Sequence, residues 1–413
     1  MNPKDIKNAA QRTAQIIADA EPYWVGVSKA IDFLDGFDEY TVLHSGPPIE
    51  YERMCSLHQR GVRNAVIMER LAENQQDAER LILSGRVKVK SAYDFNAVGS
   101  GVGIISASVP LLICEDRKTG KRAGIYPREG RFGGGFCEWG VYSEEIRDNL
   151  LYTGNKILAP FAERLASVGG FPLRDIIAEG LTMGDENHTS QNAVDALFIR
   201  KIISYAVECD NYKEILNYFS QTPRFFHNFC QSASRAALLS ASDVEGSPVV
   251  IAAGGNGVEF GIKVSGLPGE WFCAPSPMIR GRYMTENASQ ENQLPWIGDS
   301  SVVECAGLGG ILSAASPKVC SYRNESFLEG IATTERMRKI CAGENENYSI
   351  PLMGYTHTPV GIDIRAVSRN SILPVINGGI IDKNGGWMGA GCANIPLRCF
   401  ELASKAFYRK YGN

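Results

Sequence analysis

The sequence predicts a mixed α/β (α+β) protein in which two mixed α/β domains flank a central helical domain. Two observations lead to this prediction. Strand and helix patterns alternate in the first third of the 413-residue chain and again after residue 247. Between residues 143 and 246 helical periodicity dominates and strand signals are few. We therefore place domains at 1–142, 143–246 and 247–413, a division typical of domains of about 100–200 residues.

The first domain is predicted from short apolar runs that end at turn residues. Since strands alternate with helices there, some parallel pairing is expected. Ligands collect where the strands of such sheets end, and His44 and Ser45 lie at such an end. The glycine-rich run 130–136 is expected to form a hinge or mobile loop. The expected helices are 3–20, 50–60 and 75–84, and the expected strands are 40–44, 64–68 and 87–90.

The other two domains are predicted from periodicity in the same way. Glycines at 377–379 and 389–391 indicate turns, and residues 103–110 and 310–317 share a spacing of Gly, Ser and Pro. This echo is either a pair of elements facing one cleft or a coincidence of common small residues. In the central domain, helices are expected at 143–167, 172–179, 190–208, 212–219 and 224–240. In the third, strands are expected at 249–252, 259–264 and 271–274, and helices at 325–342 and 395–411.

Composition excludes several classes of protein. The net charge is −4 and the sequence has no run of Lys or Arg that would follow a nucleic-acid backbone, so no nucleic-acid partner is expected. The longest nearly apolar run, 104–114, is far shorter than the roughly 20 residues that span a bilayer. The amino terminus is unlike a signal peptide. Eleven cysteines without a CxxC pair predict reduced core residues in the cytoplasm and no zinc site.

The segment 180–188 carries the strongest functional signal. It places Asp185, Glu186 and His188 within four positions, directly before a helix expected to start at Ser190. The free amides and positive dipole end of that helix suit an anion, while the acid and base side chains suit proton transfer. The alternative is a polar turn without chemistry. Metal binding by the three side chains lacks a further ligand, so no metal is expected.

Glycine-rich turns at 99–103 and 254–257 suggest a small anionic substrate. They do not match GxGxxG or the P-loop pattern, so no nucleotide cofactor is expected. Such turns let backbone amides approach a ligand, and hydroxyl residues such as Ser106, Ser108 and Ser300 follow several of them. Ordinary turn glycines are the alternative.

Histidine is rare in this chain, which narrows the choice of a catalytic imidazole. Of the five histidines, His188 is the first candidate and His44 the second. His58 and His227 lie inside predicted helices and are expected at the surface or in packing positions.

Seven motifs follow one another along nearly the whole chain, at 43–48, 96–99, 106–110, 183–188, 260–266, 298–300 and 361–365. In these motifs the chain resembles the YlbE/YahG-like family, which includes AllG. The resemblance implies a subunit of a heteromeric oxamate carbamoyltransferase in anaerobic allantoin and purine breakdown. The implied reaction is phosphorolysis of oxalurate to oxamate and carbamoyl phosphate, with phosphate or carbamoyl phosphate as substrate and no cofactor required. The implied partners are an FdrA-like subunit and another subunit of the allantoin cluster, and a homo-oligomer is expected.

The implied reaction needs donors for phosphate, a cation for the oxalurate carboxylate and an acid for the leaving nitrogen. The helix starting at Ser190 would hold phosphate, Arg365 or Arg280 the carboxylate, and His188 or His44 the proton. The Ser-Thr-Arg-Thr loop of ordinary carbamoyltransferases is missing. Asp185 and Glu186 would also repel a dianion unless one is protonated, binds a metal or faces a substrate N–H.

Two alternatives stay open: a non-catalytic assembly subunit of an FdrA-like complex, and a metal-dependent amidohydrolase. The catalytic residues predicted from the sequence are His188, Asp185, Glu186 and His44. The predicted substrate-binding residues are Ser45, Gly46, Asn96, Gly99, Ser106, Ser108, Asn192, Asn256, Asp299, Ser300, Glu304, Asp363 and Arg365.

Overall fold

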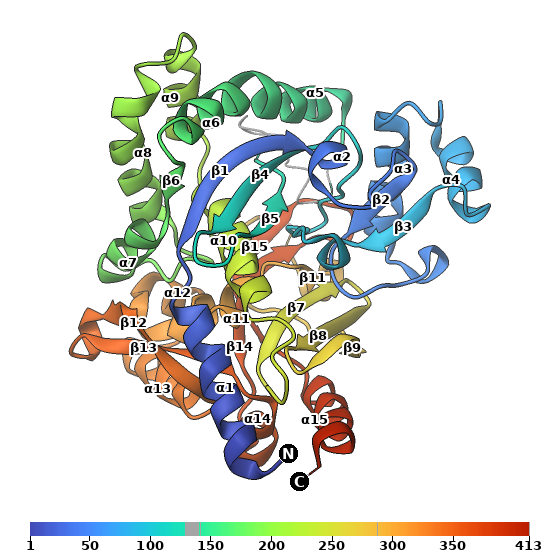
Figure 1. Ribbon diagram of the computed structural model, residues 1–413. Helices are drawn as coiled ribbons and strands as arrows, with labels where there is room; N and C mark the ends of the chain where they lie inside the picture. Colours follow the sequence, from blue (N-terminus) through green and yellow to red (C-terminus); the bar gives the residue numbers. More distant parts are fainter. Residues whose placement is uncertain (129–139, 141, 287, 413) are drawn as a thin grey trace.

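One antiparallel sheet, one parallel strand pair and covering helices make up the N-terminal part of the protein (Figure 1). The computed structural model describes residues 1–128, 140, 142–286 and 288–412. One four-stranded sheet has the order β5-β4-β1-β6, and β2 pairs in parallel with β3. The elements are α1 (Pro3–Ala18), β1 (Pro22–Lys29), α2 (Ala30–Phe33), β2 (Thr41–His44), α3 (Ser56–Met68), α4 (Gln75–Leu83), β3 (Lys88–Ser91), β4 (Pro110–Asp116) and β5 (Lys121–Ile125).

Helices follow in the middle of the chain and pack on this sheet. The last of them, α10, contacts β1, β4 and β5 and is buried from Phe226 to Leu238. A helix buried on all sides needs neighbours on every face, and here Phe198 stacks on Phe229 while Trp24 packs against it at a tilt. The elements are α5 (Glu144–Tyr152), a π-helical segment (Thr153–Leu158), α6 (Ala159–Ala166), β6 (Phe171–Pro172), α7 (Arg174–Thr182), α8 (Asn192–Ala206), α9 (Tyr212–Gln221) and α10 (Phe226–Ser240).

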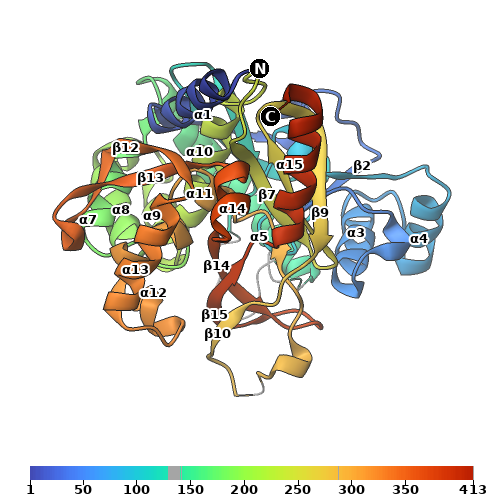
Figure 2. The same ribbon diagram turned by 90° about the horizontal axis from the view of Figure 1, so that it is seen from below.

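The C-terminal part contains a second four-stranded sheet, β11-β7-β8-β9, with α15 packed along β8 and β9 (Figure 2). A three-stranded sheet, β10-β15-β14, and the β12–β13 ribbon complete it. The strands are β7 (Val250–Asn256), β8 (Glu259–Val264), β9 (Leu267–Pro275), β10 (Arg280–Tyr283), β11 (Ile297–Gly298), β12 (Cys341–Ile350), β13 (Thr356–Ile362), β14 (Val375–Ile381) and β15 (Trp387–Asn394). The helices are α11 (Val302–Cys305), the 3-10 segment η6 (Gly309–Ala315), α12 (Pro317–Tyr322), α13 (Phe327–Arg338), α14 (Ile364–Asn370) and α15 (Leu397–Tyr411).

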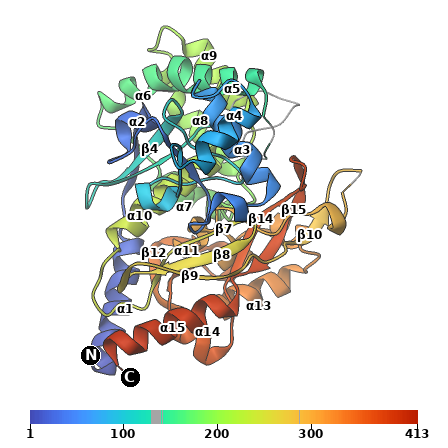
Figure 3. The same ribbon diagram turned by 90° about the vertical axis from the view of Figure 1, so that its right-hand side faces the viewer.

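The first helix lies with the C-terminal part rather than with the sheet that follows it in sequence. Figure 3 shows α1 running alongside the C-terminal elements, and its residues contact β12 and β13. The amino terminus donates to the Tyr411 carbonyl at 2.6 Å, which brings the two chain ends together. One hydrophobic core cluster also joins residues from all three predicted segments. The division into three domains stays a prediction.

The structure confirms the mixed α/β class and corrects several local predictions. The strand expected at 64–68 is the end of α3, because Val62, Ala65 and Val66 share one buried helical face. The glycines at 377–379 and 389–391 lie inside β14 and β15 rather than in turns. The echo is not a structural repeat, since 103–110 is irregular and 310–317 is largely 3-10 helix. The run 130–136, which was predicted to form a hinge or mobile loop, lies outside the described residues.

The remaining elements agree with the sequence except in their limits. The predicted helices at 3–20, 75–84, 212–219 and 395–411 correspond to α1, α4, α9 and α15. The sequence missed several strands, among them β1, β4, β5 and β10 to β15. In the part of the chain that the structure describes, every helix is too short or too polar to cross a bilayer.

Candidate active site

A polar pocket lies where residues from all three predicted segments meet. It encloses about 390 Å³ between protein atoms, including some open solvent. Basic side chains, hydroxyls and glycine backbone line one part of it, and isoleucines and a tryptophan line the rest. The lining residues are Ser100, Gly101, Arg128, His188, Arg224, His227, Ile279, Trp296, Ile297, Ser300, Gly378, Gly379 and Ile381. Of the residues predicted from the sequence, His188 and Ser300 lie directly on this pocket.

His188, which lines the pocket, forms a buried pair with a carboxylate that does not line it. Nδ1 of His188 lies 2.7 Å from Oε1 of Glu304, which belongs to α11, and both side chains are at most 2% exposed. A carboxylate on Nδ1 favours the tautomer with its proton there and leaves Nε2 for proton exchange. The ring stacks on His227 at 5.1 Å between centroids. This arrangement suits a general acid or base.

Two backbone amides hold the Glu304 carboxylate in place. Its Oε1 also accepts the N–H groups of Gly310 at 2.8 Å and Asn377 at 2.9 Å. Gly309 lies against this carboxylate, and a Cβ there would come within 2.3 Å of Oε1. Within the described part of the chain, the buried Oε2 and the side-chain amide of Asn377 have no hydrogen-bond partner. The pair therefore retains unused hydrogen-bonding capacity on Glu304 and Asn377.

Two arginines place positive charge beside the histidines. The guanidinium of Arg224 donates to the Gln191 side-chain oxygen at 2.9 Å and to the His188 carbonyl at 3.1 Å. Arg224 itself has a φ of 61°, which is uncommon for a residue with a long side chain. Burial lowers the pKa of His227 well below its usual value, so its ring stays neutral beside Arg128 and Arg224. The two arginines can attract an anion, while the His188 imidazole can donate or accept a proton.

The carboxylates of the 180–188 turn face the backbone and not the pocket. Asp185 accepts the amides of Ala193 and Val194 at 2.6 and 3.0 Å, at the start of α8. Glu186 accepts the amides of His188, Thr189 and Ser190, and burial raises its pKa to about 7. The two side chains fix the loop that presents His188.

This geometry corrects the expected phosphate site at the start of that helix. The helix begins at Asn192 instead of Ser190, and its first amides already bond to the Asp185 carboxylate. Asn192 itself is exposed. The repulsion expected between these carboxylates and a bound dianion is thereby reduced, because both are turned toward N–H groups.

Asp299 connects three turns next to the pocket. Its two oxygens accept the amides of Gly46 at 2.7 Å and Gly99 at 2.9 Å. Burial raises the pKa of Asp299 to about 8. Since Ser300 follows it directly and lines the pocket, Asp299 positions one wall of the pocket from behind.

His44 and Ser45 lie in a buried layer behind the lining residue Gly101. Nδ1 of His44 is 2.8 Å from the Ser45 carbonyl, and burial lowers the pKa of His44 to about 4. The hydroxyl of Ser45 donates to the Gly101 carbonyl at 3.0 Å. His58 is fully buried against His44, with 5.7 Å between ring centroids. The surface reading of His58 and His227 is therefore wrong, while the packing reading fits His58.

The remaining predicted residues make local contacts outside the pocket. Ser106 and Ser108 donate to the carboxylate of Glu69. Asp363 pairs with Arg365 at 2.7 Å at the start of α14. Asn96 has a left-handed backbone, Asn256 donates to the Pro47 carbonyl, and Arg280 is exposed on β10.

Sequence reasoning missed the pocket's cations. Arg128 follows β5 and Arg224 precedes α10, and neither belongs to a motif. The left-handed backbone of Arg224 leaves no signal in the sequence. His227 was considered, but as a surface or packing residue. A search for basic residues next to helix starts would have found Arg224 and His227 together.

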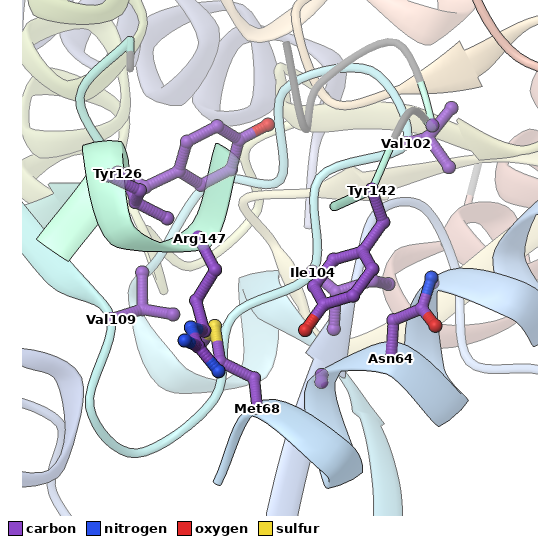
Figure 4. A pocket seen from close by; sticks show the side chains of 12 residues that line it. Asn64, Met68, Val102, Ile104, Val109, Tyr126, Tyr142 and Arg147 are labelled. Atoms are coloured by element: carbon purple, nitrogen blue, oxygen red, sulfur yellow. The ribbon is translucent and has the colours of Figure 1, made fainter. Parts of the chain in front are cut away.

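A second cavity, between α3 and α5, is mostly apolar (Figure 4). Asn64 and Met68 come from α3, and Tyr142 and Arg147 lie across from them. Among its described lining residues there is no histidine or carboxylate, so it offers less chemistry than the pocket around His188.

Comparison with known proteins identifies the family. The family described as "Oxamate carbamoyltransferase subunit AllG" matches residues 87–300. The chain is 32% identical to that subunit of Escherichia coli K12, over 98% of this chain and 99% of the other. This chain belongs to the AllG family. It is also 32% identical to the uncharacterized protein YahG of the same organism, over 98% of this chain and 87% of the other.

A solved structure agrees with this assignment. The crystal structure of a conserved protein of unknown function from Enterococcus faecalis V583 has a TM-score of 0.92 and 30% identity, over 98% of each chain. Membership of the AllG family supports a role as an enzyme subunit, as the name of the E. coli protein states.

Proposed function

We propose that this protein is a subunit of an oxamate carbamoyltransferase and that the pocket around His188 is where a ureido acid reacts with phosphate. A phosphate oxygen attacks the carbamoyl carbon of oxalurate, the bond from that carbon to the oxamate nitrogen breaks, and that nitrogen takes up a proton. The products are carbamoyl phosphate and oxamate. The buried pair of His188 and Glu304 is the observation that supports this proposal most directly.

In this reaction His188 protonates the leaving nitrogen from Nε2. Glu304 orients the ring through Nδ1 and stabilises the imidazolium before it gives up its proton. Positioned proton transfer of this kind contributes roughly 10²–10⁴-fold to a rate. The neutral His227 ring against His188 adds no competing positive charge.

Arg128 and Arg224 attract the negative reactants, phosphate and the oxalurate carboxylate. Guanidinium groups suit both, because their N–H groups match two oxygens of a carboxylate or phosphate. Glycine backbone at 101 and 378–379 lines the same pocket, so a reactant can approach the main chain closely. Holding both reactants together supplies a further share of the acceleration.

The amidohydrolase alternative finds less support. Its expected ligands Asp185 and Glu186 both accept backbone N–H groups and do not line the pocket where the His188 ring lies. Among the residues that the structure describes, no group of three or more His, Cys, Asp or Glu side chains is arranged for a metal ion.

The partners that we propose are an FdrA-like subunit and a further subunit of the same enzyme. The experiment incubates the purified chain, alone and with these subunits, with oxamate and carbamoyl phosphate, and measures phosphate release. We expect His188→Ala to lower turnover of the active mixture at least 100-fold, with His357→Ala, at an exposed side chain, as the control. If His188→Ala retains full activity, the assembly role is correct and the active site lies in a partner.

A further inference from the structure

A second arginine on α10 is buried without a counter-ion. Arg235 lies eight residues after His227, or about 12 Å along the helix. It is 4% exposed. Its guanidinium donates to the Tyr93 carbonyl at 3.0 Å and lies 4.7 Å from the centre of the Tyr93 ring. Its Nε has no partner, and in the described part of the chain it forms no ion pair.

A buried guanidinium normally has a carboxylate beside it, because an uncompensated charge is costly in a protein interior. Asp94 and Asp299, both among the described residues, interact with Arg235 by long-range electrostatic attraction and form no ion pair with it. Asp94 instead pairs with Lys263 at 3.3 Å. Asp299 accepts two backbone amides, and burial raises its pKa to about 8, so it carries little charge near neutral pH. Arg235 therefore lacks a fixed negative partner.

Arg235 lines a groove much larger than the pocket around His188. The groove holds about 1900 Å³, including open solvent, against about 390 Å³ for that pocket. Apolar side chains such as Phe33 and Leu239 line it together with charged ones of both signs, including Lys121 and Asp243. None of its lining residues lines the pocket around His188.

We propose that Arg235 binds an oxyanion, a carboxylate or a phosphate, of a small ligand in this groove, at a site separate from the pocket around His188. The oxyanion supplies the missing counter-charge, and the Nε–H and the remaining guanidinium donors supply hydrogen bonds. The apolar lining suits a carbon portion of the same ligand. The acidic lining residues favour a ligand that also carries a hydrogen-bond donor or positive group.

A substitution on the same helix face tests this without removing Arg235. Leu239 lies four residues after Arg235, also lines the groove and is only partly buried, so a carboxylate there reaches the guanidinium. Leu239→Glu supplies an internal counter-ion, and Leu239→Gln is the uncharged control of the same size. Both are made in an Arg224→Gln background, which weakens binding of the probe in the other pocket.

Calorimetric titration with inorganic phosphate and, separately, with malonate measures the site. We expect one of the two to bind Leu239→Gln and to bind Leu239→Glu at least tenfold more weakly; which of the two binds identifies the oxyanion. We also expect Leu239→Glu to melt higher than Leu239→Gln at low salt, with the difference shrinking at high salt. Equal binding to both variants, or no binding to Leu239→Gln, overturns the proposal. Neither result bears on turnover at His188, which the activity assay tests separately.

Discussion

Replacing Glu304 with glutamine removes the charge beside His188 and leaves its hydrogen bonds in place. Oε1 accepts three N–H groups, from His188, Gly310 and Asn377. The two backbone amides oblige the glutamine to turn its carbonyl oxygen toward them, since its NH₂ group would face donors. The NH₂ group then occupies the position of Oε2, which has no donor beside it among the described residues. The fold and the tautomer of His188 should both survive.

The expected loss follows from the change in that one hydrogen bond. A hydrogen bond to a charged group contributes about 1.5–3 kcal/mol and a neutral one about 0.5–1.5 kcal/mol. The difference, about 1–1.5 kcal/mol, corresponds to roughly a tenfold lower kcat. Glu304→Ala differs in kind, because it leaves three buried donors without an acceptor at about 1–3 kcal/mol each. That variant should be strongly destabilised.

The assay measures kcat of the assembled enzyme from phosphate release, together with the melting temperature of each variant. We expect Glu304→Gln to lose roughly tenfold in kcat with little change in KM or Tm. Wild-type kcat in Glu304→Gln would refute the pairing of His188 and Glu304 as an acid. A large drop in Tm would instead show that the carboxylate is needed for folding.

Three further outcomes test the surroundings of the pocket. Gly46→Ala should lower the free energy of unfolding in urea by more than about 2 kcal/mol, since φ is +80° and a Cβ would lie 2.4 Å from the β7 backbone. Gly85→Ala is the control, because φ is +73° there and the space is open. The control should lose less stability, and equal losses would contradict this prediction. His44→Asn should gain stability relative to wild type as pH falls from 6.5 to 4, by up to roughly 3 kcal/mol, because burial lowers the pKa of His44 to about 4 and only the unfolded chain takes up the proton there. Denaturation curves of His44→Asn and wild type at each pH measure this difference, and a constant difference would contradict it. Millimolar phosphate should raise the Tm of the wild type and raise that of Arg224→Gln by at most half as much; an unchanged shift would remove Arg224 from the anion site.

The sequence was sufficient for elements whose pattern is long or amphipathic. The helix α1 keeps its apolar face over four turns, and α15 does the same at the other end of the chain. Short apolar runs were ambiguous, because periodicity cannot separate a buried strand from a helix end. For this reason residues 64–68, which are helical, were predicted as a strand. For the same reason β4, which is buried along its whole length, was not recognised as a strand.

The site was predictable in its parts and not in its assembly. His188 and Glu304 each stood out in a polar segment, but 116 positions separate them and no local pattern predicts their contact. The carboxylates of Asp185 and Glu186 were recognised and given the wrong surroundings. The helix start that was predicted to offer free amides is already capped by the Asp185 side chain from the preceding turn. Only the path of the loop decides this.

Several buried polar atoms in the described part of the chain have no hydrogen-bond partner, and some of them lie at the two places that we assign to ligands. Oε2 of Glu304, the side-chain amide of Asn377 and Nε of Arg235 are three of them. Each costs about 1–3 kcal/mol when left unbonded, and packing alone gives no reason to keep them where an apolar residue would fit. Since α10 bears Arg235 at one end and His227 at the other, one buried helix connects both places. Ligands that complete these bonds would recover that free energy on binding, which gives a physical reason to retain these atoms at the two sites.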